Sequence, residues 1–322
     1  MQCRVCGNSR RSQTYQVREM MFGCRDPFDY FECSRCGCLQ ILEVPRDLSK
    51  YYPPAYYSFA PFETRASSSL KSIAKRLRGA YAVSGRGIFG RAIFWMFPQP
   101  ELRELRPLAR LRLSRNSRIL DVGCGSGRFL QLLMEAGFER VLGVDPYVEK
   151  DRQQASGLRV LKRSLQQVGG EWDLIMFHHS FEHMPDPLEM LQHTAAILSK
   201  DGCCLIRIPT VSSYAWGHYK ECWVQLDAPR HLFLHSVTSI QLLAAKAGLR
   251  VKEVIYDSTE FQFWGSEQYL RDVPLNAEQS YAKCPSGSIF SDAQIQSFRV
   301  RADWLNQHGE GDQAAFYLVK LT

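Results

Sequence analysis

The sequence predicts an α/β protein with an open, mostly parallel sheet covered by helices on both faces, preceded by a small cysteine-rich module. From residue 118 onward, short apolar runs typical of strands alternate with segments of helical spacing. A strand-like run at 118–122 leads into three closely spaced glycines and then into a helical pattern. Two Cys-x-x-Cys pairs lie near the start of the 322-residue chain.

Each core element follows from its own pattern of apolar residues. In chain order we expect strand 118–122, helix 129–136, strand 141–145, strand 158–162, strand 172–178, helix 187–198, strand 203–208, helix 237–247, strand 251–256 and strand 315–321. Residues 259–313 interrupt the alternation as an insertion before the final strand. We therefore divide the chain into a metal-binding module at 1–45, an aromatic linker and helical cap at 46–117, and an α/β domain at 118–322.

Composition and charge narrow the class of protein. Apolar residues make up 45% and charged residues 23%, as in ordinary globular proteins. Residues 1–118 hold 21 Lys and Arg against 9 Asp and Glu, whereas the remainder holds 19 against 24. The positive charge of residues 1–118 predicts an anionic partner. The alternative is that these basic side chains form a surface exposed to solvent. No apolar run reaches the roughly 20 residues that span a bilayer, and the N-terminal cysteines are unlike a signal peptide, so we expect a cytoplasmic protein.

The glycine-rich segment after the first core strand is the most informative in the chain. Gly123, Gly125 and Gly127 permit a tight turn and a close approach of backbone to ligand. The helix that follows offers N–H groups and the positive end of its dipole. Asp121 precedes the first glycine, and a second acid, Asp145, ends the next strand. The G-x-G-x-G spacing differs from the dinucleotide-binding G-x-G-x-x-G, and an acid at the strand end suits a ligand with an amino group.

This pattern resembles motif I of the class I S-adenosylmethionine (SAM)-dependent methyltransferases, which have a Rossmann-like fold with seven strands, the last antiparallel. Segment 172–187, an apolar strand followed by Glu-His and then Asp-Pro, is similar to the ubiquinone-methyltransferase-like group of types 11 and 23. The resemblance implies SAM as cofactor, with its ribose hydroxyls bonded to the Asp145 carboxylate. The residues it places at the cofactor are Asp121, Gly123, Cys124, Gly125, Gly127, Asp145, Pro146, Ser164, Leu165 and His178. Ser164 and Leu165 stand where many members carry an Asp against the adenine.

Methyl transfer also needs a group that aligns the acceptor and removes its proton, and histidine does this near neutral pH. The candidate catalytic residues follow predicted strands at the edge where ligands bind, and they are His179, Glu182, His183 and His231. Structural alternatives remain open, since His183 could orient the next helix and His178 could pack at a strand end. Arg230 stands where similar sugar C-methyltransferases carry Glu, and it would suit gripping a phosphate or carboxylate.

The two Cys-x-x-Cys pairs have the spacing of zinc knuckles, and each is followed by a glycine that permits a tight turn. We expect their thiolates to hold one structural Zn²⁺ in a closed site formed by Cys3, Cys6, Cys33 and Cys36. Free thiols or a redox pair are the alternatives. A zinc-binding head of this kind resembles two groups, the sugar C-methyltransferases and the ribosomal RNA methyltransferases with an N-terminal zinc finger.

Three functions remain open. The first is a methyltransferase for an anionic small molecule, such as a sugar, a sugar nucleotide or a related envelope or natural-product metabolite. The second is an rRNA or tRNA methyltransferase that docks nucleic acid through the zinc module, and the third is a non-catalytic SAM-binding scaffold. The basic amphipathic segment 71–97 is expected to form helices that could touch a membrane. The tyrosines of 51–57 either pack as a linker or fold over the acceptor.

Overall fold

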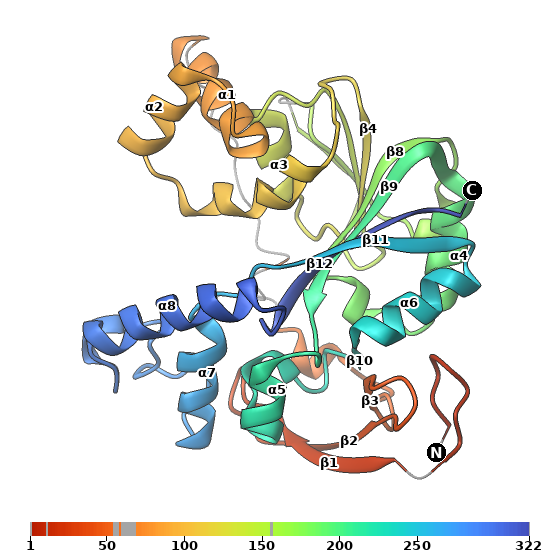
Figure 1. Cartoon of the computed structure of the whole chain (residues 1–322), viewed down its shortest axis with the longest axis vertical. Helices are drawn as coiled ribbons and strands as arrows, with labels where there is room; N and C mark the ends of the chain where they lie inside the picture. The colour runs from red at the N-terminus through yellow and green to blue at the C-terminus, as the bar shows by residue number, and fades with distance from the viewer. Residues whose placement is uncertain (1, 11, 54–57, 59–68, 155–156, 322) are drawn as a thin grey trace. The chain divides into compact units, whose positions relative to one another are not determined.

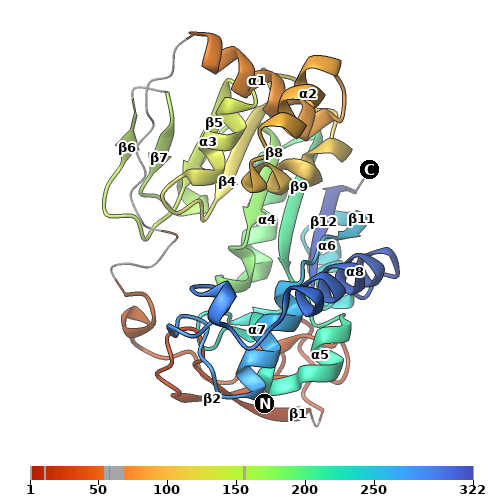
Figure 2. The same cartoon turned by 90° about the vertical axis from the view of Figure 1, so that its left-hand side faces the viewer.

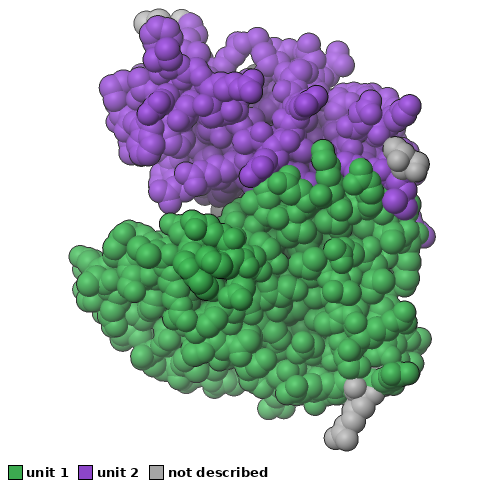
Figure 3. Space-filling view, in the orientation of Figure 1, with its two compact units in different colours: residues 1–53, 181–191, 207–316 green, residues 54–180, 192–206, 317–322 purple. Residues whose placement is uncertain are grey.

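The computed structural model describes residues 2–10, 12–53, 58, 69–154 and 157–321 and divides into two compact units (Figure 3). Unit 1 consists of residues 1–53, 181–191 and 207–316, and unit 2 consists of residues 54–180, 192–206 and 317–322. Tyr56 and Tyr57, which belong to the suggested tyrosine lid, lie outside the described residues. Within the described parts of the chain, no helix combines the length and apolar character needed to cross a membrane.

Unit 1 contains a small antiparallel sheet built mainly from the N-terminal region (Figure 1). Its strands, in spatial order, are β1 (Gln13–Arg18), β2 (Pro27–Glu32), β3 (Leu39–Ile41) and β10 (Phe233–Leu234). Phe233 pairs with Gln40, and Leu234 pairs with Leu39. The cysteine-rich head is therefore completed by a strand from the far half of the chain.

The remaining helices and strand of unit 1 are α5 (Tyr214–Tyr219), α6 (Val237–Lys246), β11 (Leu249–Tyr256), α7 (Phe261–Leu270) and α8 (Asp292–Gln307). The sequence predicted α6 and β11, but it did not predict the three other helices. Helices α7 and α8 occupy the insertion predicted between the last two strands. Capping explains where α8 begins, because Ser291 and Gln294 form a reciprocal capping box.

Unit 2 carries the central strands and a helical hairpin. Its elements are α1 (Ser69–Ser84), α2 (Ile88–Met96), a long 3₁₀ segment (Pro100–Arg110), β4 (Arg118–Val122), α3 (Arg128–Glu135), β5 (Arg140–Val144), β6 (Arg152–Gln153), β7 (Arg159–Leu161) and β8 (Trp172–His178). Three further elements are divided between the units, namely α4 (Pro187–Ile197), β9 (Leu198–Pro209) and β12 (Gln313–Lys320). The helices at 69–84 and 88–96 confirm that the basic segment 71–97 is helical, and the glycines at 85 and 87 lie between them.

The large sheet has eight strands in the order β11-β12-β9-β8-β4-β5-β7-β6. Strand β4 pairs in parallel with β5 and β8, and β5 pairs in parallel with β7, which confirms a mostly parallel core. The expectation of seven strands is wrong because Arg152 and Gln153 add an antiparallel edge strand to β7 (Figure 2). Two residues are too few to show the alternation from which a strand is recognised in sequence.

Strand β4 shows why the core reads as an apolar run. Ile119 and Leu120 are fully buried although they point to opposite faces, as expected for a central strand covered on both sides. Asp121 pairs with Gly143 of β5 and with Met176 of β8. The carboxyl ends of these parallel strands therefore meet at one edge of the sheet, where open α/β sheets bind their ligands.

Candidate functional site

The glycine-rich loop of unit 2 joins the ends of β4 and β5. The N–H of Gly123 donates to the carbonyl of Val144 at 2.8 Å, which ties the first glycine to the end of β5. The carboxylate of Asp145 accepts the N–H of Gly125 at 2.9 Å and the N–H of Tyr147 at 2.8 Å. These bonds fix the orientation of the Asp145 carboxylate beside the loop.

Two glycines of the loop are required by the chain's own packing. Gly123 and Gly125 have φ angles of +74° and +54°, where side chains other than hydrogen are strained. A Cβ on Gly123 would overlap the Ser180 side chain, and a Cβ on Gly125 would overlap the Ser58 carbonyl. The same Ser58 carbonyl accepts the N–H of Ser126 at 2.8 Å. The glycines of this loop therefore make room for other parts of the chain as well as for a ligand.

Asp121 is the unusual group of this region. Its side chain is 2% exposed, and its Oδ1 has no hydrogen-bond partner among the described residues. Burial, with a further contribution from the nearby charge of Asp145, raises the pKa of Asp121 to about 7. A buried carboxylate oxygen without a donor is costly, so it identifies a place where a ligand's amino group would be stabilising.

The structure gives other predicted cofactor residues different surroundings. Ser164 forms a capping box with Gln167 at the start of a 3₁₀ turn (Leu165–Gln167), and Leu165 is buried there. Pro146 is exposed. The ring of His178 stacks on Phe129 with 4.4 Å between ring centroids, which accords with packing at a strand end.

The four candidate catalytic residues divide between the units. His179 lies in unit 2 beside His178, with 5.1 Å between ring centroids. Glu182, His183 and His231 lie together in unit 1, each offering a ligand atom within 4.8 Å of the others. The ring of His183 is 4.8 Å from that of His231, whose Nε2 is 3.9 Å from Glu182 Oε1. A short 3₁₀ helix (Phe181–His183) and the loop before β10 bring these side chains together.

The hydrogen bonds of the two histidines define which nitrogen is available. Nδ1 of His183 lies 2.8 Å from the Arg230 carbonyl, and Nδ1 of His231 lies 2.8 Å from the Gln225 carbonyl. A carbonyl only accepts, so each Nδ1 carries a proton and donates it, and Nε2 is the other nitrogen of each ring. Burial, together with the nearby His183, lowers the pKa of His231 to about 4, so this ring is neutral at pH 7. The contact between His231 and Glu182 is therefore not an ion pair at pH 7.

Arg230 does not take the substrate-gripping role that the sequence suggested. Its side chain is fully buried, and its guanidinium donates to both Asp227 carboxylate oxygens, to Glu19 Oε1 at 2.9 Å and to the Tyr51 carbonyl at 3.0 Å. Burial would lower the pKa of Arg230, but the charges of Asp227 and Glu19 raise it above its usual range. The residue instead ties the head of the chain to the loop that carries His231.

The cysteine head forms the four-sulfur cluster that the spacing predicts. The Sγ atoms of Cys3 and Cys36 are 3.6 Å apart, and those of Cys6 and Cys33 are 3.5 Å apart. All four lie within 4.8 Å of one another, and Zn–S bonds of about 2.3 Å in a tetrahedron place sulfurs roughly 3.8 Å apart. The thiols thus fit a zinc ion. Cys24 is exposed and outside the cluster.

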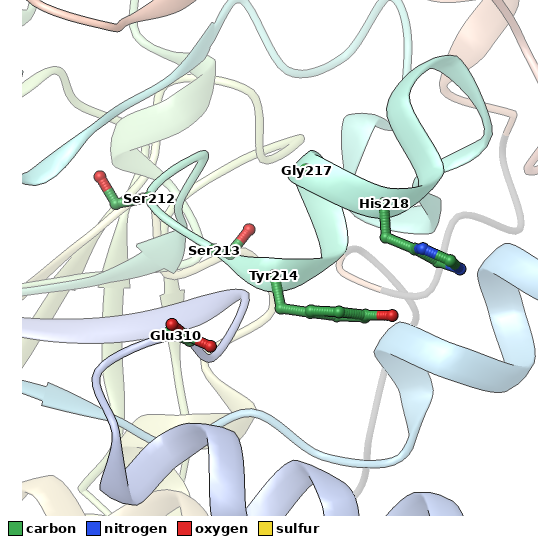
Figure 4. A pocket seen from close by; sticks show the side chains of 6 residues that line it. All are labelled: Ser212, Ser213, Tyr214, Gly217, His218 and Glu310. Atoms are coloured by element: carbon green, nitrogen blue, oxygen red, sulfur yellow. The ribbon is translucent and has the colours of Figure 1, made fainter.

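An open pocket of about 460 Å³ lies on unit 1 (Figure 4). Its lining residues come from α5, the loop before it and the turn before β12, and they are Ser212, Ser213, Tyr214, Gly217, His218 and Glu310. The Tyr214 and His218 rings stack at 5.2 Å, and the Arg301 guanidinium lies 4.4 Å from the Tyr214 ring. No sequence pattern pointed to this pocket, because its residues are ordinary polar and aromatic types on a helix and two turns.

Sequence reasoning also missed two buried groups beside the histidine cluster. His235 is fully buried between Phe181 and Phe233, and burial lowers its pKa to about 3. Glu19 is fully buried and accepts the N–H groups of Phe22 and Cys24 as well as the Arg230 guanidinium. Neither lies in a motif, and only the chain's folding shows their partners.

Comparison with known proteins gives the family context. Residues 94–254 match the family described as a methyltransferase domain. A ubiquinone biosynthesis O-methyltransferase from Bordetella avium is 29% identical over 129 residues, covering 34% of this chain and 53% of that protein. A trans-aconitate 2-methyltransferase from an Enterobacter species is 27% identical over 136 residues, covering 40% and 48%. The chain spans about half the length of these curated relatives.

Solved structures show weaker similarity. The cyclopropane synthase MmaA2 from Mycobacterium tuberculosis aligns with 16% identity and a TM-score of 0.43 over 80% of this chain and 100% of that chain. A SAM-dependent methyltransferase from Archaeoglobus fulgidus aligns with 18% identity and a TM-score of 0.43 over 73% and 100%.

Proposed function

The chain belongs to the class I SAM-dependent methyltransferases, and we propose that it transfers the methyl group of SAM to a small-molecule acceptor. One observation supports the cofactor site above all. The buried Asp121 carboxylate, with an oxygen that no described residue bonds, lies beside Asp145 where β4 and β5 end. This pair offers oxygen acceptors to a ligand that carries both an amino group and ribose hydroxyls.

The residues of unit 2 divide the cofactor between them in this proposal. Asp121 accepts the amino group of the methionine part, and Asp145, oriented by the N–H groups of Gly125 and Tyr147, accepts the ribose hydroxyls. The helix α3 directs its N-terminal N–H groups toward the loop. When bound, SAM supplies a methyl group on a positively charged sulfur that a nucleophile can attack.

The acceptor-side chemistry is assigned to the cluster in unit 1. His183 is partly exposed, whereas Glu182 and His231 are buried, so His183 is the member that an acceptor can reach. Its Nδ1–H is held by the Arg230 carbonyl, which leaves Nε2 to take the acceptor's proton. The ring of His231, which is neutral at pH 7, lies against His183 and does not compete for the proton.

For the acceptor itself we propose an anionic metabolite of the sugar or sugar-nucleotide class. The resemblance of the cysteine head to that of sugar C-methyltransferases and the basic N-terminal region of the sequence support this choice. The buried Arg230 cannot supply the anion-binding group, so exposed basic side chains must do so. A methyl-transfer screen with radiolabelled SAM against nucleotide sugars, phenols and carboxylic acids tests the class of acceptor. Incorporation of label into phenols or carboxylic acids alone would refute the proposed sugar class.

Titration calorimetry with SAM tests the cofactor site. Asp145→Asn should weaken SAM binding at least tenfold, because the amide replaces one of the two acceptor oxygens with an NH2 donor. The exposed Asp201→Asn is the matched control and should bind as the wild type does. Equal affinity in all three proteins would refute the placement of the ribose, and absence of any SAM binding would refute the enzyme proposal.

The pH dependence of binding tests Asp121 separately. Its carboxyl, with a pKa of about 7, is largely neutral below that pH and pairs poorly with an ammonium group. SAM affinity should therefore rise between pH 6 and pH 8, and Asp121→Asn should flatten this rise as well as weaken binding. A rise of the same size in Asp121→Asn would assign the titration to another group.

A further inference from the structure

The hairpin formed by α1 and α2 has an exposed apolar face. Seven of the fifteen large apolar side chains that are exposed in the described parts of the chain fall between residues 73 and 97, a concentration that singles out this segment. They are Ile73, Leu77, Ile88, Phe89, Trp95, Met96 and Phe97. Those of α2 and its C-terminal end are the most exposed, with Ile88 at 86%, Phe89 at 78% and Trp95 at 71%.

The inner faces of the hairpin are already used in packing. Gly79 of α1 is buried, and a Cβ there would overlap the Ala136 backbone at the end of α3. Gly90 of α2 is buried as well, and a Cβ there would overlap the Leu77 carbonyl of α1. Two glycines thus hold α1 against α3 and α2 against α1. The apolar side chains that stay exposed lie on other faces of these helices, so they are not simply the hairpin's own core.

The charge of this segment is entirely of one sign. Residues 69–97 contain six basic residues and no Asp or Glu. Lys75 is used internally, since it pairs with Glu135 at 2.9 Å. Four others are exposed around the apolar face, namely Lys71, Arg76, Arg86 and Arg91. The combination of aromatic and aliphatic side chains with flanking cations is typical of helices that lie in the surface of an anionic membrane.

We propose that the α1–α2 hairpin docks the protein peripherally on an anionic lipid surface. The aromatic and aliphatic side chains of α2 enter the headgroup boundary, and the exposed cations contact lipid phosphates. A second copy of the hairpin would bring four exposed positive charges against four, which disfavours self-association. Nucleic acid would satisfy the cations but leave Phe89 and Trp95 in water. The proposal goes beyond the proposed function, because it concerns where the protein binds and not which acceptor it uses.

Co-sedimentation of the full chain with vesicles tests the proposal. The protein should bind vesicles of phosphatidylcholine with 30% phosphatidylglycerol, bind neutral phosphatidylcholine vesicles at least tenfold more weakly, and dissociate as salt is raised. Phe89→Ser with Trp95→Ser, and separately Lys71→Glu with Arg91→Glu, should each lower the partition coefficient at least tenfold. No binding to the anionic vesicles would overturn the proposal.

Matched controls exclude a general loss of folding or a different partner. Ile289→Ser with Trp304→Ser removes two exposed apolar side chains elsewhere, and Lys252→Glu with Lys283→Glu reverses two exposed charges elsewhere, so both should bind vesicles as the wild type does. Equal losses in controls and hairpin variants would overturn the proposal. Two other results would overturn the proposal: the hairpin variants abolish salt-sensitive RNA retention but still bind vesicles, or they abolish dimerisation but still bind vesicles. SAM affinity, measured in the same variants, should stay unchanged, which separates this result from failure of the cofactor site.

Discussion

At the residue scale, the chemistry of this protein depends on ionisable side chains whose burial changes their behaviour. Three buried residues show this. Burial raises the pKa of Asp121 and lowers the pKa of His231. Burial would also lower the pKa of Arg230, but two carboxylates raise it instead. For Asp121 and His231 the effect of burial decides the direction of the shift, whereas for Arg230 the charges of Asp227 and Glu19 outweigh it. The sequence identified all three positions but could not supply their partners.

His231 should make stability depend on pH in the mildly acidic range. Its folded pKa of about 4 lies below the unfolded value of about 6.5, so the unfolded chain binds the proton more readily. The stability that the neutral ring contributes is full above pH 6.5 and falls as pH drops toward 4, by on the order of 3 kcal/mol. Urea unfolding at pH 7, 5.5 and 4.5 should show a smaller loss in His231→Asn than in the wild type, while the exposed His308→Asn should lose as much as the wild type.

Arg230 should be essential for stability. Arg230→Met would leave the fully buried Glu19 and the nearby Asp227 without their cation, and unpaired buried charge costs about 3–5 kcal/mol. The ion pair of the exposed Arg271 with the half-buried Glu267 is the comparison, and Arg271→Met should cost no more than about 1 kcal/mol, because Glu267 keeps the Tyr219 hydroxyl as a donor. Chemical denaturation at pH 7 measures both. Equal, small losses in the two variants would show that the buried network is not the stabilising feature described here.

At the scale of elements, the cysteine head and the loop that carries His231 are joined by hydrogen bonds into one assembly. The Tyr30 hydroxyl donates to the His231 carbonyl at 2.8 Å, the Lys246 ammonium donates to the Val5 carbonyl at 2.8 Å, and the Ser236 hydroxyl donates to the Cys36 carbonyl. Pairing of β3 with β10 adds backbone bonds between the same segments. A structural zinc in the head would therefore stabilise the loop that carries His231.

Metal analysis should find one zinc per chain, held by the four clustered cysteines. Cys33→Ser should lose the metal and lower the melting temperature, because ligand removal takes away binding energy that contributes to folding. Cys24→Ser changes an exposed thiol outside the cluster and should keep both the zinc and the melting temperature. Zinc retained in Cys33→Ser, or a metal-free wild type of the same stability, would argue for free thiols.

At the scale of the whole molecule, the chain passes repeatedly between its two units. Unit 1 draws on three separate stretches of sequence, and so does unit 2. The cofactor-binding residues proposed here belong to unit 2, whereas the zinc cluster and the Glu182–His183–His231 cluster belong to unit 1. Cofactor binding is thus proposed for unit 2, and metal binding and proton transfer for unit 1, although the segments of the two units alternate along the sequence.

Removal of the head should therefore damage more than the head. A chain cut to residues 54–322 would lose β1, β2 and β3, leaving β10 without its strand partner and Arg230 without Glu19 and the Tyr51 carbonyl. We expect this shortened chain to aggregate or to lack a cooperative thermal transition, as measured by size-exclusion chromatography and circular dichroism. A monomeric, cooperatively folding fragment would show instead that the head is a separable module.

The sequence by itself determined the features that depend on local pattern. Strand β4, the glycine-rich turn, the acids at 121 and 145, the order of the core elements and the cysteine cluster are all readable because hydrophobic periodicity and ligand spacing are local properties. Only the tertiary structure decided that Arg230 is buried in an ion network, that β10 completes the N-terminal sheet, that an eighth strand exists and that α2 keeps an apolar face exposed. These features depend on which distant segments meet, and on whether a side chain finds a partner or stays in water, and such long-range pairing leaves no periodic trace in the sequence.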